Sequence, residues 1–177
     1  MPDTIDNAFL ACQRALEDMI LPAIDEANPL AVEQAQLVLR MLGLLRARAT
    51  LLHPKARKEL ELNRSAALAV AGPLRALDPT VADRLEAETG AAGHLLADPA
   101  ATTDALNRSA AAIASLIGTA VGACGPRDDP AARQVERIAI DSQGALIDLH
   151  RAWFAPTGFD DTAHLPPLDI LLAAPKP

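Results

Sequence analysis

Apolar residues recur every three or four positions through most of the chain, which is the spacing of one face of an α-helix. Five pairs, each a capping residue followed by proline, divide this pattern: Asn28-Pro29, His53-Pro54, Asp78-Pro79, Asp98-Pro99 and Asp129-Pro130. The pattern predicts helices over about residues 4–21 or 4–24, 29–51, 54–77, 79–96, 102–124 and 130–154. Because the connections are short, we expect an all-α, up-and-down bundle of about six helices.

From Ala155 the chain becomes rich in proline and acidic residues, which predicts an extended C-terminal tail. We therefore expect two parts, a helical bundle domain over 1–154 and a tail over 155–177. The tail also carries apolar residues, which indicate that part of it packs on the bundle or on a partner subunit: Leu165, Leu168, Ile170, Leu171 and Leu172.

The first two helices differ in their apolar patterns. The first has one inward stripe, formed by Ile5, Phe9, Cys12, Leu16, Met19 and Ile20, and Pro22 must kink or end it. The second is apolar nearly all round between Leu37 and Leu45. Such a helix is either central in the bundle or covered by a second subunit. Both cysteines, Cys12 and Cys124, fall on apolar stripes, so we expect buried, reduced thiols.

A six-residue stretch occurs twice, as Leu62–Ala67 and as Leu106–Ala111. In the first copy the predicted stripe is Leu62, Ala66, Ala69, Val70, Pro73 and Leu77; in the second it is Leu106, Ala110, Ile113, Ile117, Ala120 and Cys124. Two Asn-Arg-Ser triplets could form a symmetric polar site. A similar helix start used twice in an alanine-rich chain accounts for the match more simply, and we favour that interpretation.

The sixth predicted helix turns Val135, Ile138, Ser142, Leu146, Leu149 and Trp153 inward. Ile140 and Ile147 form a second strip, so we expect this helix to touch two neighbours.

Composition narrows the class of protein. Half of the 177 residues are apolar, but only one Trp, three Phe and no Tyr are present. The net charge of −7 argues against nucleic acid as the main partner, since binding to phosphates needs a basic face. No stretch is apolar and long enough to span a membrane, and the acidic N-terminus does not resemble a secretion signal. We expect a cytoplasmic protein.

Basic residues cluster where the second predicted helix meets the third. Arg46, His53, Lys55, Arg57 and Lys58 lie within 13 positions, with no acid before Glu59. Cations beside the free N–H groups of a helix start suit a phosphate or carboxylate. The simpler interpretation is that these side chains are solvated or pair with acids of the first helix, such as Glu17 and Asp18.

Three of the four aromatic residues lie between positions 150 and 159. Trp and Arg are common anchors of protein interfaces, so Arg151, Trp153, Phe154 and Phe159 are candidate interaction residues. The structural alternative, which we favour, is that the cluster closes one end of the bundle and turns the chain into its tail.

No motif identifies a reaction or a cofactor. None of the serines stands in a Gly-x-Ser-x-Gly elbow, and no glycine-rich phosphate loop is present. His53, His94, His150 and His164 lack the Glu-x-x-His spacing of bundle metal sites. We therefore assign no catalytic, cofactor or metal residue.

Ile20-Leu21-Pro22-Ala23-Ile24, followed by the amphipathic run Val32–Arg46, resembles a small helical domain of unknown function. That domain is attached to, or encoded beside, kinase-like phosphotransferases related to aminoglycoside kinases, often near acyl-CoA dehydrogenases. The similarity covers the first three helices, whereas the later helices and the tail depart from it. It implies an accessory role and supplies no catalytic residues.

The sequence thus favours a non-catalytic interaction protein over an enzyme, one that forms a homodimer through the second helix and the tail or docks on a partner enzyme. The alternative is a binding module for an acidic metabolite, such as a nucleotide or acyl-CoA, at the basic cluster.

Overall fold

The computed structural model describes residues 4–125 and 128–173. Regular structure in these residues is entirely helical, without a strand, which confirms the predicted all-α class. Contacts between residues divide the chain into two compact units. Unit 1 holds Met1–Leu52 and His150–Pro167, and unit 2 holds His53–Leu149 and Leu168–Pro177. This division differs from the predicted boundary between residues 154 and 155, because the first two helices fall in a different unit from the next four and the tail is shared between the units.

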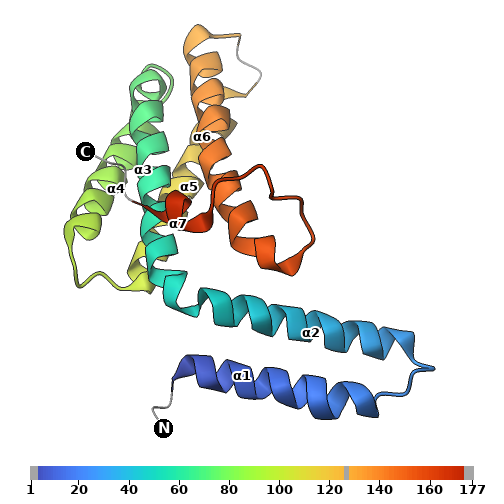
Figure 1. The fold of residues 1–177 in the computed structure, drawn as a ribbon. Helices are drawn as coiled ribbons and strands as arrows, with labels where there is room; N and C mark the ends of the chain where they lie inside the picture. Colours follow the sequence, from blue (N-terminus) through green and yellow to red (C-terminus); the bar gives the residue numbers. More distant parts are fainter. Residues whose placement is uncertain (1–3, 126–127, 174–177) are drawn as a thin grey trace. The chain divides into compact units, whose positions relative to one another are not determined.

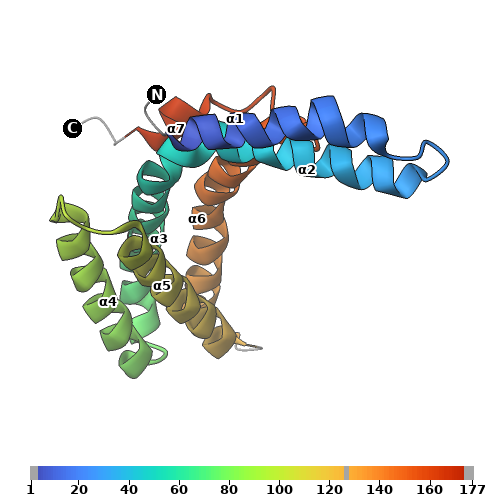
Figure 2. The ribbon, with the colours of Figure 1, turned by 90° about the horizontal axis from the view of Figure 1, so that it is seen from below.

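The first part of unit 1 is a helical hairpin. Helix α1 (Ile5–Ala15) starts after Thr4, whose Oγ1 accepts the Asn7 N–H at 3.4 Å. Helix α2 (Pro29–Arg48) starts after Asn28, whose Oδ1 accepts the Ala31 N–H at 3.2 Å. The two helices pack side by side and antiparallel (Figures 1 and 2). We call residues 4–51 the α1–α2 hairpin.

Pro22 changes the type of helix at the end of α1. A π-helical turn, η1 (Leu16–Ile20), is followed by a 3₁₀ turn, η2 (Leu21–Ala23). The Leu21 N–H donates to Leu16 O, five residues back, and the Ile24 N–H donates to Leu21 O, three residues back. Pro22 lies between these two donors, where its missing N–H breaks no bond of a regular α-helix. The predicted ending of the first helix is confirmed.

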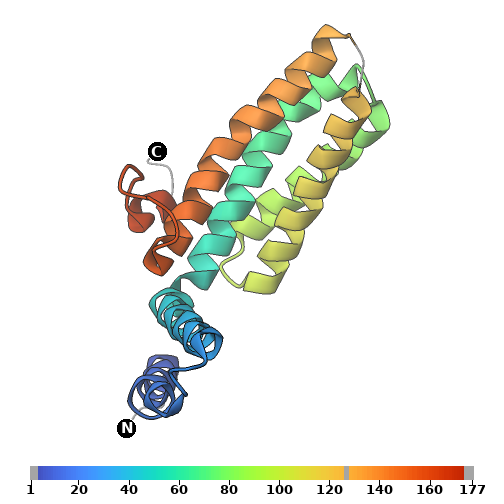
Figure 3. The same cartoon turned by 90° about the vertical axis from the view of Figure 1, so that its right-hand side faces the viewer.

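Unit 2 is built on four antiparallel helices that run up, down, up and down (Figure 3). They are α3 (Leu52–Arg75), α4 (Pro79–Ala97), α5 (Thr103–Cys124) and α6 (Pro130–Phe154), of which α6 ends within unit 1. One buried apolar cluster takes residues from all four. A short helix, α7 (Leu168–Leu172), lies where the tail was expected to be extended, and the Lys58 Nζ donates to Ala173 O just after it, at 2.9 Å.

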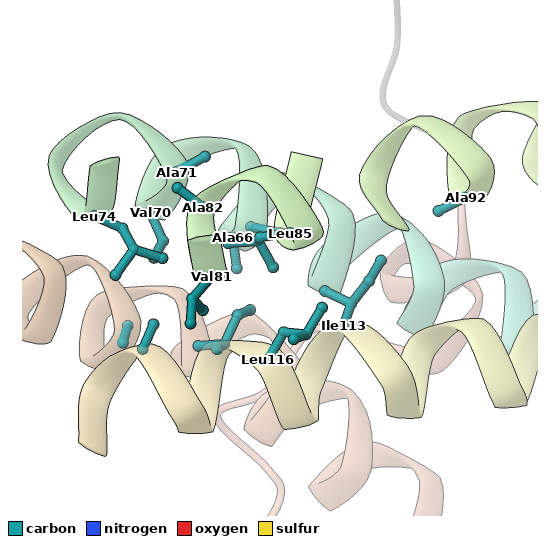
Figure 4. Packing of buried hydrophobic residues seen from close by; sticks show 14 of the residues in the cluster. Ala66, Val70, Ala71, Leu74, Val81, Ala82, Leu85, Ala92, Ile113 and Leu116 are labelled. Carbon is teal, nitrogen blue, oxygen red and sulfur yellow. The ribbon is translucent and has the colours of Figure 1, made fainter. Parts of the chain in front are cut away.

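Small side chains fill much of the core of unit 2. Figure 4 shows Ala66, Val70 and Ala71 of α3 beside Ala82 and Leu85 of α4, with Ile113 and Leu116 of α5 nearby. Alanines at contact positions allow helix backbones to approach closely, and few aromatics are then needed to fill the space.

Most predicted helix starts agree with the structure. Asp78 Oδ1 accepts the Val81 N–H at 3.0 Å, and Thr102 Oγ1 accepts the Ala105 N–H at 3.2 Å. The predicted cap at His53 is wrong, because a 3₁₀ turn, η3 (Ala49–Leu51), leads directly into α3 at Leu52, two residues before Pro54. Pro54 therefore stands in the first turn of the helix, where a missing N–H has no cost.

The two copies of the repeated stretch occupy different environments. The predicted stripe of α5 is correct, since all six of its residues are buried. The stripe of α3 is correct only in part: Ala66 and Val70 are buried, but Ala69 is exposed. Asn63, Ala67 and Leu74 are buried as well, so the buried face is rotated from the predicted one. Asn63 is 8% exposed and donates to Glu59 O, while Asn107 is exposed. The copies therefore do not form a symmetric polar site.

Two further predictions of burial are wrong. Cys12 is exposed, although Cys124 is buried as expected. Ile140 and Ile147 of α6 are exposed and do not form a second contact strip. In both cases the apolar spacing is real, but no other helix covers that face in the part of the chain that the structure describes.

Candidate functional site

The most unusual surface of the molecule is the apolar stripe of α1 and η1. Its members follow one another by three or four residues and share one side of the helix: Ile5, Phe9, Cys12, Leu16 and Met19, with Ile20 beside them. None of them is buried, and Met19 is 73% exposed. We call these six residues the α1 stripe. A run of large apolar side chains on one helix face marks an interaction surface more often than single exposed residues do.

Helix α2 is also poorly covered. Leu44 is its only buried residue among those described, so burial at the centre of a bundle, one of the two alternatives for this helix, is not seen. Val38, Met41 and Leu45, spaced by three and four residues, are each about half exposed. Gly43 marks the side that faces α1, because a Cβ built there would lie 3.4 Å from the Gln13 Nε2. The hairpin thus has apolar side chains on more faces than its two helices can cover.

A groove between α1 and α2 contains an ion pair. It is lined by Asp6, Gln13, Gly43, Arg46 and Ala47. The Arg46 Nε donates to the Asp6 Oδ1 at 2.7 Å, and its second nitrogen donates to Oδ2 at 3.2 Å. This two-point hydrogen bond lowers the pKa of Asp6 and raises that of Arg46. Arg46, a predicted anion ligand, therefore already holds a carboxylate.

The other predicted anion ligands lie in unit 2, where each contacts a group of its own unit. Lys55 pairs with Glu59, and Arg57 donates to Leu96 O of α4. Lys58 donates to Ala173 O and lies 3.6 Å from Glu61. His53 Nδ1 lies 3.2 Å from Thr103 Oγ1. These contacts fit the structural interpretation of the basic cluster, although the partners differ from the acids of the first helix that we had considered.

The predicted interaction anchors divide into buried and exposed residues. Trp153 is buried; the Arg48 guanidinium lies 5.6 Å from its ring centre, and the Arg48 Nε donates to Trp153 O at 3.1 Å. Burial lowers the pKa of Arg48. Arg151 donates to Asp160 at 2.6 Å and 3.0 Å, which lowers the pKa of Asp160. These contacts fix the turn from α6 into the tail.

Phe154 and Phe159, the other two anchors, are exposed. The Arg40 guanidinium lies 5.7 Å from the centre of the Phe159 ring, within cation–π range. Phe159 therefore joins the apolar surface of unit 1, whereas Trp153 and Arg151 have structural contacts. Sequence reasoning did not find the roles of Arg40 and Arg48, because their partners are more than a hundred positions away.

A metal site would need several ligand side chains close together. Within 4–125 and 128–173, no three His, Cys, Asp or Glu side chains lie where they could hold a metal ion together. Across the same residues, no helix combines the length and the apolar character needed to cross a membrane.

No family model, curated protein or solved structure matches this chain.

Proposed function

We propose that the protein is a non-catalytic interaction protein that self-associates through the α1–α2 hairpin. The observation that carries the proposal is that no residue of the α1 stripe is buried: Ile5, Cys12, Met19 and Ile20 are exposed, and Phe9 and Leu16 are only partly buried. The resemblance to small accessory helical domains, which covers this part of the chain, points to the same kind of role.

The stability of short helices supports this proposal. An α-helix of 11 residues is marginal in water by itself and depends on burying its apolar face. In the isolated chain α1 packs against α2, yet its apolar stripe stays in contact with water. Each square ångström of apolar surface removed from water contributes about 25 cal/mol. A second copy of the stripe would provide the missing cover.

Twofold symmetry makes a second copy a natural occupant. In a twofold dimer the same patch is used on both subunits, so one apolar stripe is enough to form the interface. The exposed side chains of α2 and Phe159 add apolar area to the same unit. The proposed interface therefore includes α2 and the tail, as the sequence predicts, and has α1 at its centre.

The test compares two substitutions of equal exposure. Met19 of η1 is 73% exposed and Ile140 of α6 is 72% exposed, so neither variant should disturb the fold. We expect the wild-type chain to sediment at about twice its 18.6 kDa mass at micromolar concentration. Met19→Lys should weaken the dimer about a hundredfold, because it brings an unpaired ammonium into an apolar contact. Ile140→Lys should leave the dimer unchanged.

A wild-type chain that remains monomeric at tens of micromolar would overturn the proposal. So would dissociation by Ile140→Lys but not by Met19→Lys, since the interface would then involve α6. Circular dichroism of both variants would verify that their helix content equals that of the wild type.

A further inference from the structure

We infer that two hairpins pair antiparallel, with the tip of each beside the base of the other; this inference rests on the proposed self-association. The arguments are the charge distribution along the hairpin and the centred position of Cys12 in the α1 stripe.

The tip of the hairpin is strongly acidic. Between positions 15 and 39 the chain contains Glu17, Asp18, Asp25, Glu26 and Glu33 and no lysine or arginine, a charge of −5. These residues form the end of α1, the connection and the first half of α2. Two tips placed side by side would therefore bring together ten negative charges, which is unfavourable for parallel pairing.

The base of the hairpin has the opposite sign. The base consists of residues 4–14, 40–52 and 150–167. The last segment belongs to it because η4 (Ala155–Thr157) contacts α2 and because the rings of Phe159 and Trp153 lie beside Arg40 and Arg48 of α2. Five arginines and three aspartates give this part a net charge of +2: Arg14, Arg40, Arg46, Arg48, Arg151, Asp6, Asp160 and Asp161. Antiparallel pairing places each acidic tip beside a basic base, so the charges fix the orientation while the apolar stripes supply the contact.

The antiparallel arrangement predicts which residues meet. The α1 stripe extends from Ile5 to Ile20, so its midpoint lies beside Cys12. In an antiparallel pair of stripes, residues at the midpoint face their own copies across the twofold axis. With a rise of 1.5 Å per residue, the two Cys12 side chains would be offset along the axis by only about 2 Å, whereas the two copies of Ala23 would be about 30 Å apart.

The experiment cross-links the dimer with a short bifunctional maleimide and resolves the products on a denaturing gel. The wild-type protein should give a covalent dimer through Cys12, because Cys124 is buried. Cys12→Ser should abolish the product. The double variant Cys12→Ser/Ala23→Cys, which moves the thiol to the exposed tip, should give no covalent dimer while still sedimenting as a dimer.

Charge reversal at the tip gives a second, independent measurement. Glu17→Lys/Asp18→Lys should weaken an antiparallel dimer about tenfold, since it places cations beside the basic base. The same change would strengthen a parallel dimer. Glu88→Lys/Asp141→Lys, in unit 2, is the matched control: it alters the net charge equally and should not weaken association.

The outcomes separate this inference from the function on which it rests. A covalent dimer of the double variant Cys12→Ser/Ala23→Cys, or a dimer that the tip reversal strengthens, would overturn the antiparallel arrangement and leave self-association standing. A dimer that cross-links at neither position would overturn it as well. A monomer in sedimentation would remove both proposals.

Discussion

The two units share the same sequence pattern, yet they bury very different amounts of it. Both use capped helix starts and apolar residues every three or four positions. The buried apolar cluster is drawn from α3–α6 in unit 2, whereas α1 has no buried residue and α2 has one among the residues described. Periodicity therefore defines a helix face, while the number of neighbouring helices decides whether that face is buried.

Geometry explains why the hairpin remains uncovered. Four helices can surround a common axis, so each has two neighbours and turns its stripe toward the centre. Two helices have one contact line between them, and every apolar residue away from that line stays in water. In unit 2, the most buried side chains include Leu60 of α3, Leu85 of α4 and Leu106 of α5.

The largest expected effect on stability comes from a leucine-to-alanine substitution, made once in each unit. Leu85 is 0% exposed and Leu30, at the start of α2, is 64% exposed. Leu85→Ala should lower the free energy of unfolding by about 2–5 kcal/mol, because it leaves a cavity in the core. Leu30→Ala should change it by less than about 0.5 kcal/mol. Urea unfolding followed by circular dichroism measures both, and equal losses would contradict the contrast between the units.

An intermediate effect is expected at the helix caps. Asp78-Pro79 and Asn28-Pro29 are caps of the same type. The Asp78 side chain accepts the Val81 N–H at 3.0 Å, and the Asn28 side chain accepts the Ala31 N–H at 3.2 Å. Asp78→Ala should cost about 1 kcal/mol of unfolding free energy, because α4 is part of the cooperative core. Asn28→Ala should instead increase amide hydrogen exchange in the first turn of α2, with little change in the unfolding of unit 2. If Asn28→Ala destabilised unit 2 as much as Asp78→Ala, the two units would unfold together.

The smallest effect is a pH dependence in unit 1. Hydrogen bonds from Arg46 and Arg151 lower the pKa of Asp6 and Asp160 below the ordinary value of 3.8. Since the folded-state pKa values are lowered, these pairs stabilise unit 1 above about pH 4, and the contribution is lost as the pH falls through the lowered values. Carboxyl NMR titration should give midpoints below 3.8 for both groups. Arg46→Met should return the Asp6 midpoint toward 3.8 and leave that of Asp160 unchanged.

Much of the fold could be predicted from the sequence because local signals determine helix ends. The caps at Asn28, Asp78 and Thr102 and the boundaries of α6 agree with the structure. The buried face of α3 could not be placed, since Asn63 is polar and its burial depends on a bond to its own helix at Glu59 O. Hydropathy gives no sign of that bond.

The candidate site was predicted less well. The spacing predicts the apolar character of helices one and two. Whether Cys12 and the other residues of the α1 stripe are covered depends on how many helices pack nearby, and spacing alone does not show that. The basic residues form a cluster in the sequence, which predicts an anion site. Lys55 pairs with the nearby Glu59, but the partners of Arg57 and Arg46, Leu96 O and Asp6, are about 40 positions away and are known only from the fold.

The single tryptophan means that intrinsic fluorescence reports on only one of the two units. Trp153 is the only Trp, no Tyr is present, and the residue belongs to unit 1. Its indole is buried beside the Arg48 guanidinium, so its emission should shift to longer wavelength when that contact opens. Intrinsic fluorescence therefore follows the unfolding of unit 1, while the large alanine-rich core of unit 2 contains no Trp or Tyr chromophore. The protein carries a built-in reporter for the part of the chain that we propose mediates association.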